Sequence, residues 1–277
     1  MTEPTSHAGY VFDRQRGDHE RLIQSSELLA PFIIEGCVRT GLARGGRAID
    51  IGCGPIGALP VLAELVGPEG RVLGLDASGE ALGTARAILD ERGFKMVTLV
   101  EAELANVPTS DLCPPGPFDL AYVRRFLVHQ ADPAASLRRI AELLRPGGRI
   151  VAHEIPPGTG YPSLTPRVPA LQRVDELVHA AVHARGGKYD AAHHFEALCR
   201  DAGVRVLGQR GFLPAAQPVL LLETFQAVLG SLRPVIVHHH LATTGEIDDL
   251  LHQLEEAKQG KYVSCFANLY IEVIAEA

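Results

Sequence analysis

The chain has 277 residues, of which 46 % are hydrophobic and 21 % charged. This balance is typical of a globular protein with a buried core, and the length allows one sizeable α/β domain with additions or two small domains. The formal net charge of −7 gives no general attraction to nucleic acid or to an anionic membrane surface, so we expect neither as a partner.

Export is not expected either. The first twenty residues are polar and charged, without the apolar segment of a signal peptide, and no apolar run reaches membrane-spanning length. Five cysteines are scattered without a C-x-x-C pair: Cys37, Cys53, Cys113, Cys199 and Cys265. An odd, scattered set is typical of reduced thiols, so we expect a cytoplasmic protein without a disulfide framework.

The first half of the chain predicts strands that alternate with helices. Residues 18–41 carry apolar side chains at helical spacing, and we expect Pro31 to divide them into two helices. Apolar strands are expected at 47–52, 71–78, 96–103, 118–126 and 148–154, with helices at about 55–66, 79–92 and 133–148. This alternation predicts an α/β fold, a Rossmann-like, doubly wound, mostly parallel sheet of seven strands.

The pattern changes after residue 154. Residues 155–169 are rich in Pro and Gly and predict a loop, followed by helical residues over 166–202. A strand at 204–212, helices near 217–231 and 245–257, and a last strand within 262–277 complete the expected sheet and its additions. We expect one domain over 1–277, in which 1–41 is an N-terminal helical segment, 42–155 the ligand-binding core, 156–257 a helical lid and 258–277 a C-terminal strand.

A glycine-rich turn follows the first expected strand, in "RAIDIGCGPIGALP". Gly52, Gly54 and Gly57 satisfy the spacing G-x-G-x-x-G of dinucleotide sites, where a helix N-terminus binds a pyrophosphate. A carboxylate, Asp50, ends the strand, and it would repel a nearby pyrophosphate. The combination favours a ligand that carries an ammonium or sulfonium group, although capping of the following helix is an alternative role for Asp50.

Four stretches resemble the class I S-adenosylmethionine (SAM)-dependent methyltransferases, and their small-molecule, UbiE-like branch in particular. "AIDIGCGPIG" resembles the first motif of that family, "LGLDAS" the second, and "LLRPGGRI" the turn before the fifth strand; the run "FDLAYVRRFLVHQADPAASLRRIAELLRPGGRIVAHE" is similar as a whole. The resemblance covers about residues 8–155. It departs from the usual G-x-G-x-G, because Pro55-Ile56-Gly57 moves the third glycine along by one.

The resemblance implies a set of residues that bind the cofactor, SAM. Asp50 would anchor the methionine amino group directly or through water, above a backbone floor made by Gly52, Cys53 and Gly54. Asp76 would hold the ribose hydroxyls. The remaining implied contacts are Ala77, Ala102 and Glu103 at the adenine, with Glu101 as the competing acid, Arg124 at the methionine half, and Tyr10 and Gln24 in a segment that closes over the cofactor.

Two histidines follow the expected strand ends on the ligand side. His129 and His153 are candidates for the base that removes a proton from the methyl acceptor, although a structural role is the alternative for each. His179 and His183 have a spacing compatible with a metal ligand pair, but no third ligand of matching register and no H-E-x-x-H accompany them. We therefore expect no metal.

The resulting expectation is methyl transfer from SAM to a small, apolar acceptor, for instance one of secondary metabolism. The lid would supply the apolar surface through Leu164, Val168, Leu171, Phe212, Leu220, Leu222 and Phe225. Two alternatives stay open: a SAM-binding enzyme of the same fold that catalyses a cyclisation or rearrangement, and an NAD-dependent oxidoreductase. The sequence also leaves open a homodimer.

Overall fold

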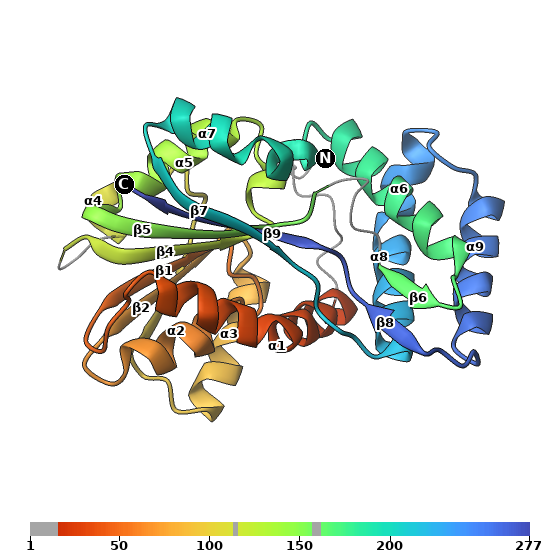
Figure 1. Ribbon diagram of the computed structural model, residues 1–277, viewed down its shortest axis with the longest axis horizontal. Helices are drawn as coiled ribbons and strands as arrows, with labels where there is room; N and C mark the ends of the chain where they lie inside the picture. The colour runs from red at the N-terminus through yellow and green to blue at the C-terminus, as the bar shows by residue number, and fades with distance from the viewer. Residues whose placement is uncertain (1–15, 113–115, 157–161) are drawn as a thin grey trace, which may run out of the picture.

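The fold is built on a single seven-stranded sheet. The computed structural model describes residues 16–112, 116–156 and 162–277. The strand order is β3-β2-β1-β4-β5-β9-β7 (Figure 1). These strands are β1 Arg47–Ile51, β2 Arg71–Asp76, β3 Val97–Glu101, β4 Phe118–Arg124, β5 Leu144–Glu154, β7 Arg205–Phe212 and β9 Tyr270–Glu276.

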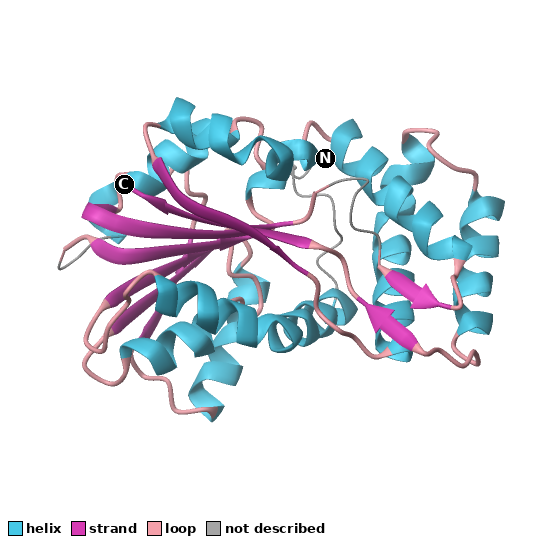
Figure 2. Cartoon of the chain, viewed as in Figure 1, coloured by secondary structure: helices cyan, strands magenta, loops and turns pink. Residues whose placement is uncertain are grey.

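Strands β1 to β5 pair in parallel, and β9 lies antiparallel between β5 and β7. The strand order reverses beside β1, whose neighbours are β2 and β4. Ligands of doubly wound folds bind at the carboxyl ends of the strands at such a point. Helices cover both faces, with α1, α2 and α3 on one side and α4, α5 and α7 on the other (Figure 2). The predicted fold class is confirmed.

The helices are α1 Arg16–Arg39, α2 Leu59–Val66, α3 Gly79–Glu91, α4 Thr109–Leu112, α5 Pro133–Ala141, α6 Pro169–Ala184, α7 Phe195–Ala202, α8 Pro218–His238 and α9 Thr244–Ala257, with short 3-10 turns at Leu127–His129 and Tyr189–His194. The expected break at Pro31 is wrong, because α1 is continuous through it. Pro31 lies on the exposed side, so its missing N–H leaves a carbonyl that water can reach, while Leu29 and Ile33 anchor the helix in the core.

Further differences concern the expected loop after β5, the expected C-terminal strand and the helix after β1. The expected loop over 155–169 contains a short strand, β6 Ser163–Thr165, which pairs antiparallel with β8 Ser264–Phe266. The expected C-terminal strand is therefore two strands in two sheets. The helix after β1 also begins at Leu59, four residues later than predicted, because residues 52–58 form turns.

Helices α6, α8 and α9 and the small sheet β6-β8 form a lid at the right end of Figure 1. The lid has an apolar core of its own, which includes Val174, Leu222, Leu229 and Ile247. Within the described residues one helix, α8, is long and apolar enough to cross a membrane by length and composition. This helix packs against α6 and α9, and 39 % of its apolar stretch is buried.

A buried carboxylate, Glu272, connects β9 to both neighbouring strands and to α1. Its oxygens lie 2.9 Å from His153 Nε2 on β5, 2.7 Å from Arg210 Nε on β7 and 2.8 Å from Arg39 on α1. Burial raises the pKa of Glu272, but the hydrogen bonds from His153 and Arg210 outweigh this and hold it below the usual range. These three partners compensate the charge of the buried Glu272 carboxylate. Without them, the charge would be costly to bury.

We expect Glu272→Ala to lower the free energy of unfolding by about 2–3 kcal/mol, because it removes a charged acceptor that three side chains share. Urea unfolding followed by circular dichroism measures the change. Glu35→Gln is the matched control: Glu35 also pairs with Arg210 but is 53 % exposed, and loss of a surface pair costs less than about 1 kcal/mol. Equal losses in the two variants would contradict the assignment.

Candidate functional site

Two cavities open at the carboxyl ends of the parallel strands. The larger has a volume of about 660 Å³ and lies among the ends of β1, β2 and β4, the turn after β1, and α1. The smaller lies between α1, α6, α8 and the residues around β9. Three residues, Arg21, Ser25 and Arg125, line both cavities. The two cavities are therefore neighbours that share one wall.

The turn after β1 forms one side of the larger cavity through Gly52, Cys53 and Gly54. The amides of Gly52 and Cys53 donate to the Leu75 carbonyl at 2.8 and 3.1 Å, which fastens the turn to the end of β2. Gly52 and Gly54 have φ of +71° and +56°, a region that favours glycine. Burial raises the pKa of the Cys53 thiol well above its usual value, which agrees with a packing role for that side chain.

Asp50 lies behind this turn and does not line the larger cavity. Its Oδ2 accepts a hydrogen bond of 2.6 Å from the Ala58 amide, and a Cβ at Gly57 would come within 2.2 Å of the same oxygen. Burial raises the pKa of Asp50 to about 7, partly opposed by the Ala58 amide and the Arg124 guanidinium. The structure thus gives Asp50 the capping arrangement, in which it shapes the turn that the ligand would meet.

Asp76 lies in the larger cavity at the end of β2, as predicted. Its Oδ2 accepts from the Gly54 amide and its Oδ1 from the Ser78 amide, both at 2.8 Å. Each carboxylate oxygen can accept a second hydrogen bond, so the side chain can still bind a pair of ligand hydroxyls. Ala77 lines the same cavity.

Of the two competing acids after β3, the structure places Glu103 in the larger cavity, together with Ala102. Asn106 donates to Glu103 Oε2 at 2.7 Å and so orients its carboxylate. Glu101 is exposed and lies beside Gly79 at the start of α3. The geometry therefore favours Glu103 over Glu101 as a ligand contact.

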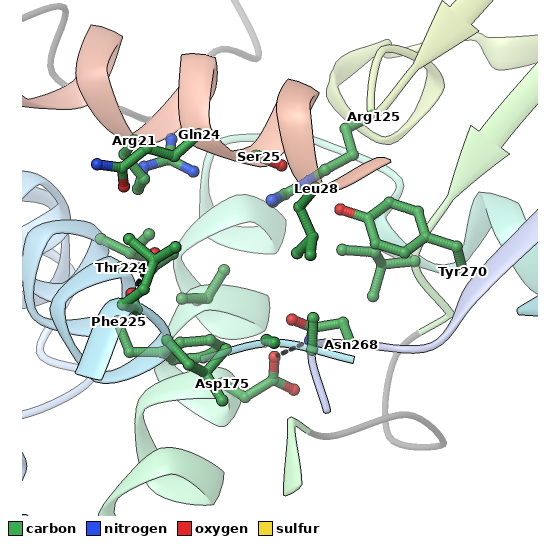
Figure 3. Close-up of a pocket in the computed structure, with 17 residues that line it drawn as sticks. Arg21, Gln24, Ser25, Leu28, Arg125, Asp175, Thr224, Phe225, Asn268 and Tyr270 are labelled. Atoms are coloured by element: carbon green, nitrogen blue, oxygen red, sulfur yellow. Dashed lines mark hydrogen bonds between the residues drawn. The ribbon is translucent and has the colours of Figure 1, made fainter. Parts of the chain in front are cut away.

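Arg124 ends β4 and lines the larger cavity, where it donates to Ser25 Oγ at 3.2 Å and Ser26 Oγ at 2.7 Å. These bonds fasten α1 across the end of the sheet. Gln24 does not line the larger cavity; it faces the smaller one instead (Figure 3), whereas Leu22 and Ser25 of the same helix line the larger cavity. Tyr10 lies outside the described residues.

The two candidate bases are in different environments. His129 lines the larger cavity next to Gln130 and Phe126. His153 is fully buried and lines neither cavity. Burial lowers the pKa of His153 despite Glu272, so the ring is neutral, and both its nitrogens are used: Tyr122 lies 3.0 Å from Nδ1 and Glu272 2.9 Å from Nε2. The prediction that His153 removes an acceptor proton is corrected, since the ring cannot reach a ligand in either cavity.

The smaller cavity combines an apolar wall with a few polar groups. Leu220 and Phe225 of that wall were predicted as apolar lid residues, whereas sequence reasoning missed the polar groups. Its lining residues are Arg21, Gln24, Ser25, Leu28, Arg125, Ile155, Asp175, Val178, Ala216, Leu220, Leu221, Thr224, Phe225, Val228, Ala267, Asn268 and Tyr270. In Figure 3 the Arg125 side chain enters from above, whereas Asp175 and Asn268 lie below it. Arg125 has φ of +51°, and strain of this kind in a non-glycine residue is often found at functional sites.

A signal for Asp175 exists in the sequence. Asp175 stands four residues after Leu171 and three before Val178, so it occupies the apolar face of its helix. A carboxylate on such a face is unusual, because ionisable side chains are seldom buried without a partner or a function. Arg125 has no comparable signal, since its neighbour Arg124 is the same residue type.

Comparisons with known proteins agree with this geometry. A model of a family described as a methyltransferase domain matches residues 42–193. An uncharacterised protein of transposon TN4556 from Streptomyces fradiae is 41 % identical over 128 residues, which cover 46 % of this chain and 34 % of that protein. The demethylmenaquinone methyltransferase of Anoxybacillus flavithermus is 33 % identical over 126 residues, which cover 46 % of this chain and 50 % of that enzyme.

The matched segment spans half or less of the length of these two relatives. Among solved structures, the cyclase SpnF aligns with a TM-score of 0.54 at 16 % identity and covers 96 % of each chain. Similarity at this level of identity shows the fold alone.

We expect Asp50→Asn to change how stability depends on pH. A carboxyl whose pKa is 3.8 in the unfolded chain and about 7 in the folded protein binds more protons when folded. Its contribution to stability is therefore lost as pH rises from 4 through 7. The asparagine, which has no such proton, should gain up to about 4 kcal/mol relative to the wild type over that range.

Urea unfolding at pH 4 to 8 measures this difference. Asp90→Asn is the matched control, since Asp90 is 65 % exposed and should show no trend. A constant difference between Asp50→Asn and the wild type at all pH values would contradict the buried, capping position.

Proposed function

The chain belongs to the methyltransferase-domain family of class I SAM-dependent enzymes, whose model matches more than half of its residues, and we propose that it transfers the methyl group of SAM to a small, apolar acceptor. The observation that carries this proposal is the shared wall of the two cavities. The larger cavity lies beside a smaller, mostly apolar one, so a cofactor and an acceptor could bind as neighbours.

The residues of the larger cavity fit SAM. Gly52 and Gly54 present backbone without side chains, so a ligand can approach the turn closely. Asp76 has the position and free acceptor capacity to bind both ribose hydroxyls, while Ala77, Ala102 and Glu103 would border the adenine. Arg124 and Ser25 would lie at the methionine half. Asp50 would act on the cofactor through the turn that it caps.

The cofactor supplies an activated methyl group on a sulfonium sulfur. The protein has to align that methyl with the acceptor atom and exclude water from the space between them. Alignment of two bound reactants is worth on the order of 7–11 kcal/mol in good cases. Helix α1 serves this purpose because it closes both cavities and is fastened to the sheet by Arg124 at one point and Arg39 at another.

The acceptor is proposed to bind in the smaller cavity. Leu28, Leu221, Phe225 and Val228 make most of that wall apolar, and the cavity has a volume of about 80 Å³, which together favour a small molecule with an apolar body. The net charge of −7 disfavours a nucleic acid as substrate. The substrate of the Anoxybacillus relative does not carry over, because nine of the seventeen residues that line this cavity, five of them on α8, lie beyond residues 42–193, which match the family.

We expect Asp76→Asn to weaken SAM binding about ten- to a hundredfold, since a charged acceptor contributes about 1.5–3 kcal/mol to a hydrogen-bonded ligand. Isothermal titration calorimetry with SAM and its demethylated product measures the effect. Asp111→Asn, at an exposed position on α4, is the control and should bind like the wild type. Unchanged binding in Asp76→Asn would remove Asp76 from the site.

Transfer itself is tested with methyl-labelled SAM and a panel of apolar acceptors that carry a hydroxyl, an amine or an acidic carbon. Label should move to at least one acceptor. Tight SAM binding with no transfer to any of them would contradict the proposed function and favour a cyclisation or rearrangement on the same fold.

A further inference from the structure

A buried carboxylate in the wall of the smaller cavity has no role in the binding of SAM described above. Resting on the proposed function, we propose that Asp175 receives the proton that the methyl acceptor loses during transfer. The inference assigns the role proposed for His153 to a residue that lies after the motif stretches of the sequence, the last of which ends at Glu154.

The position of Asp175 fits this task. The residue is 4 % exposed and lies on the cavity side of α6, so its carboxylate meets a ligand and not bulk water. Asn268 donates to Oδ1 at a long 3.4 Å, and His179 Nε2 lies 3.2 Å from Oδ2. In Figure 3 the carboxylate reaches the edge of the cavity and the dashed line joins it to Asn268. The hydrogen bond from Asn268 orients the carboxylate, and both of its oxygens keep acceptor capacity for a ligand.

The surrounding charges keep this carboxylate able to take a proton. Burial raises the pKa of Asp175 to about 6; Arg125, across the cavity, lowers it, and Glu176, its neighbour on α6, raises it. Arg21 and Tyr270 are the other ionisable groups that line the cavity. Burial and Arg125 lower the pKa of His179 to about 4, so this ring is neutral near pH 7. Asp175 is then mostly ionised at pH 7, yet only slightly acidic, which suits a general base.

The chemical step balances without a further reagent. An electron pair of the acceptor oxygen forms the bond to the methyl carbon as the bond from that carbon to sulfur breaks, and the sulfur keeps the pair. The O–H bond of the acceptor breaks, and its proton goes to Asp175 Oδ.

The cavity and its base together favour an apolar ring that carries a weakly acidic hydroxyl. A phenolic hydroxyl has a pKa of about 10, within reach of such a carboxylate, whereas that of water is about 15.7 and an unactivated alcohol is comparably weak as an acid. The apolar side chains Leu28, Phe225 and Val228 would border the ring.

Binding of 2-naphthol in the presence of the demethylated cofactor tests the contact directly. Its hydroxyl should donate to ionised Asp175, so calorimetry should find binding at least fivefold tighter at pH 8 than at pH 5. In Asp175→Asn the affinity should not depend on pH, and 2-methoxynaphthalene, which lacks the proton, should show no dependence with the wild type. Absent or pH-independent binding of 2-naphthol to the wild type would overturn the proposal.

Single-turnover transfer from labelled SAM to 2-naphthol, or to the best acceptor of the panel, gives the second readout. The wild-type rate should rise with pH, and the midpoint of this rise, which we call the limb of the pH profile, should lie near pH 6. Asp175→Asn, which preserves size and hydrogen bonding, should lower the rate about 10²–10⁴-fold and abolish the limb, with SAM affinity within twofold. Glu176→Gln, a neighbour on the same helix, should keep the rate and shift the limb slightly downward.

The outcomes separate the two proposals. If the wild type and all variants bind SAM but transfer no methyl group, the proposed function is refuted. Transfer by Asp175→Asn at the wild-type rate with the limb intact would refute only the role of Asp175. If Asp175→Asn does not fold, a carbon-13 NMR titration of the wild-type Asp175 carboxyl must show a change when 2-naphthol binds, and no change would overturn the proposal.

Discussion

The hydrogen bond between the Asp50 carboxylate and the Ala58 amide determines the shape of the site. This bond joins two residues that are separated by seven others and so closes the turn after β1. Helix α2 then begins at Leu59. Gly57 belongs to the same constraint, because any side chain there would occupy the space of the Asp50 oxygen. The exposed backbone of Gly52 and Gly54 follows from this closure. The Asp50 side chain thus shapes the backbone that a ligand in the larger cavity would meet.

The sheet was predictable because its signals are local. Strands β1, β2 and β4 are apolar over most of their length and each is followed by a helix, and this alternation favours a parallel sheet that helices cover on both faces. The pairing of β6 with β8 was not predictable, since Thr165 and Ser264 stand 99 residues apart and each strand has only three residues. The continuous helix through Pro31 was missed for a related reason: tertiary packing of Leu29 and Ile33 overrides a local helix breaker.

The same difference between local signals and long-range packing explains which site residues could be predicted from the sequence. Asp76, Glu103 and Arg124 end strands beside the point of reversal, so a sequence position implies a place in space. His153 also ends a strand, but alternate side chains of a strand point to opposite faces. Its ring packs between Tyr122 and Phe212 in the core, away from both cavities. The smaller cavity needs residues from α1, β4, α6, α8 and the C-terminal segment, and no local pattern predicts which of them meet.

Some elements of the site lie within the residues that match the family, and others lie outside them. The turn, the strand ends and α5 lie within the residues that match the family, whereas α1, α8, α9 and β9 lie outside them. Helix α1 nevertheless belongs to both halves of the site, because Ser25 and Arg21 line both cavities. A change in α1 that suits a new acceptor must therefore preserve the bonds from Arg124 to Ser25 and Ser26. This coupling limits how freely acceptor specificity can vary while the cofactor site stays the same.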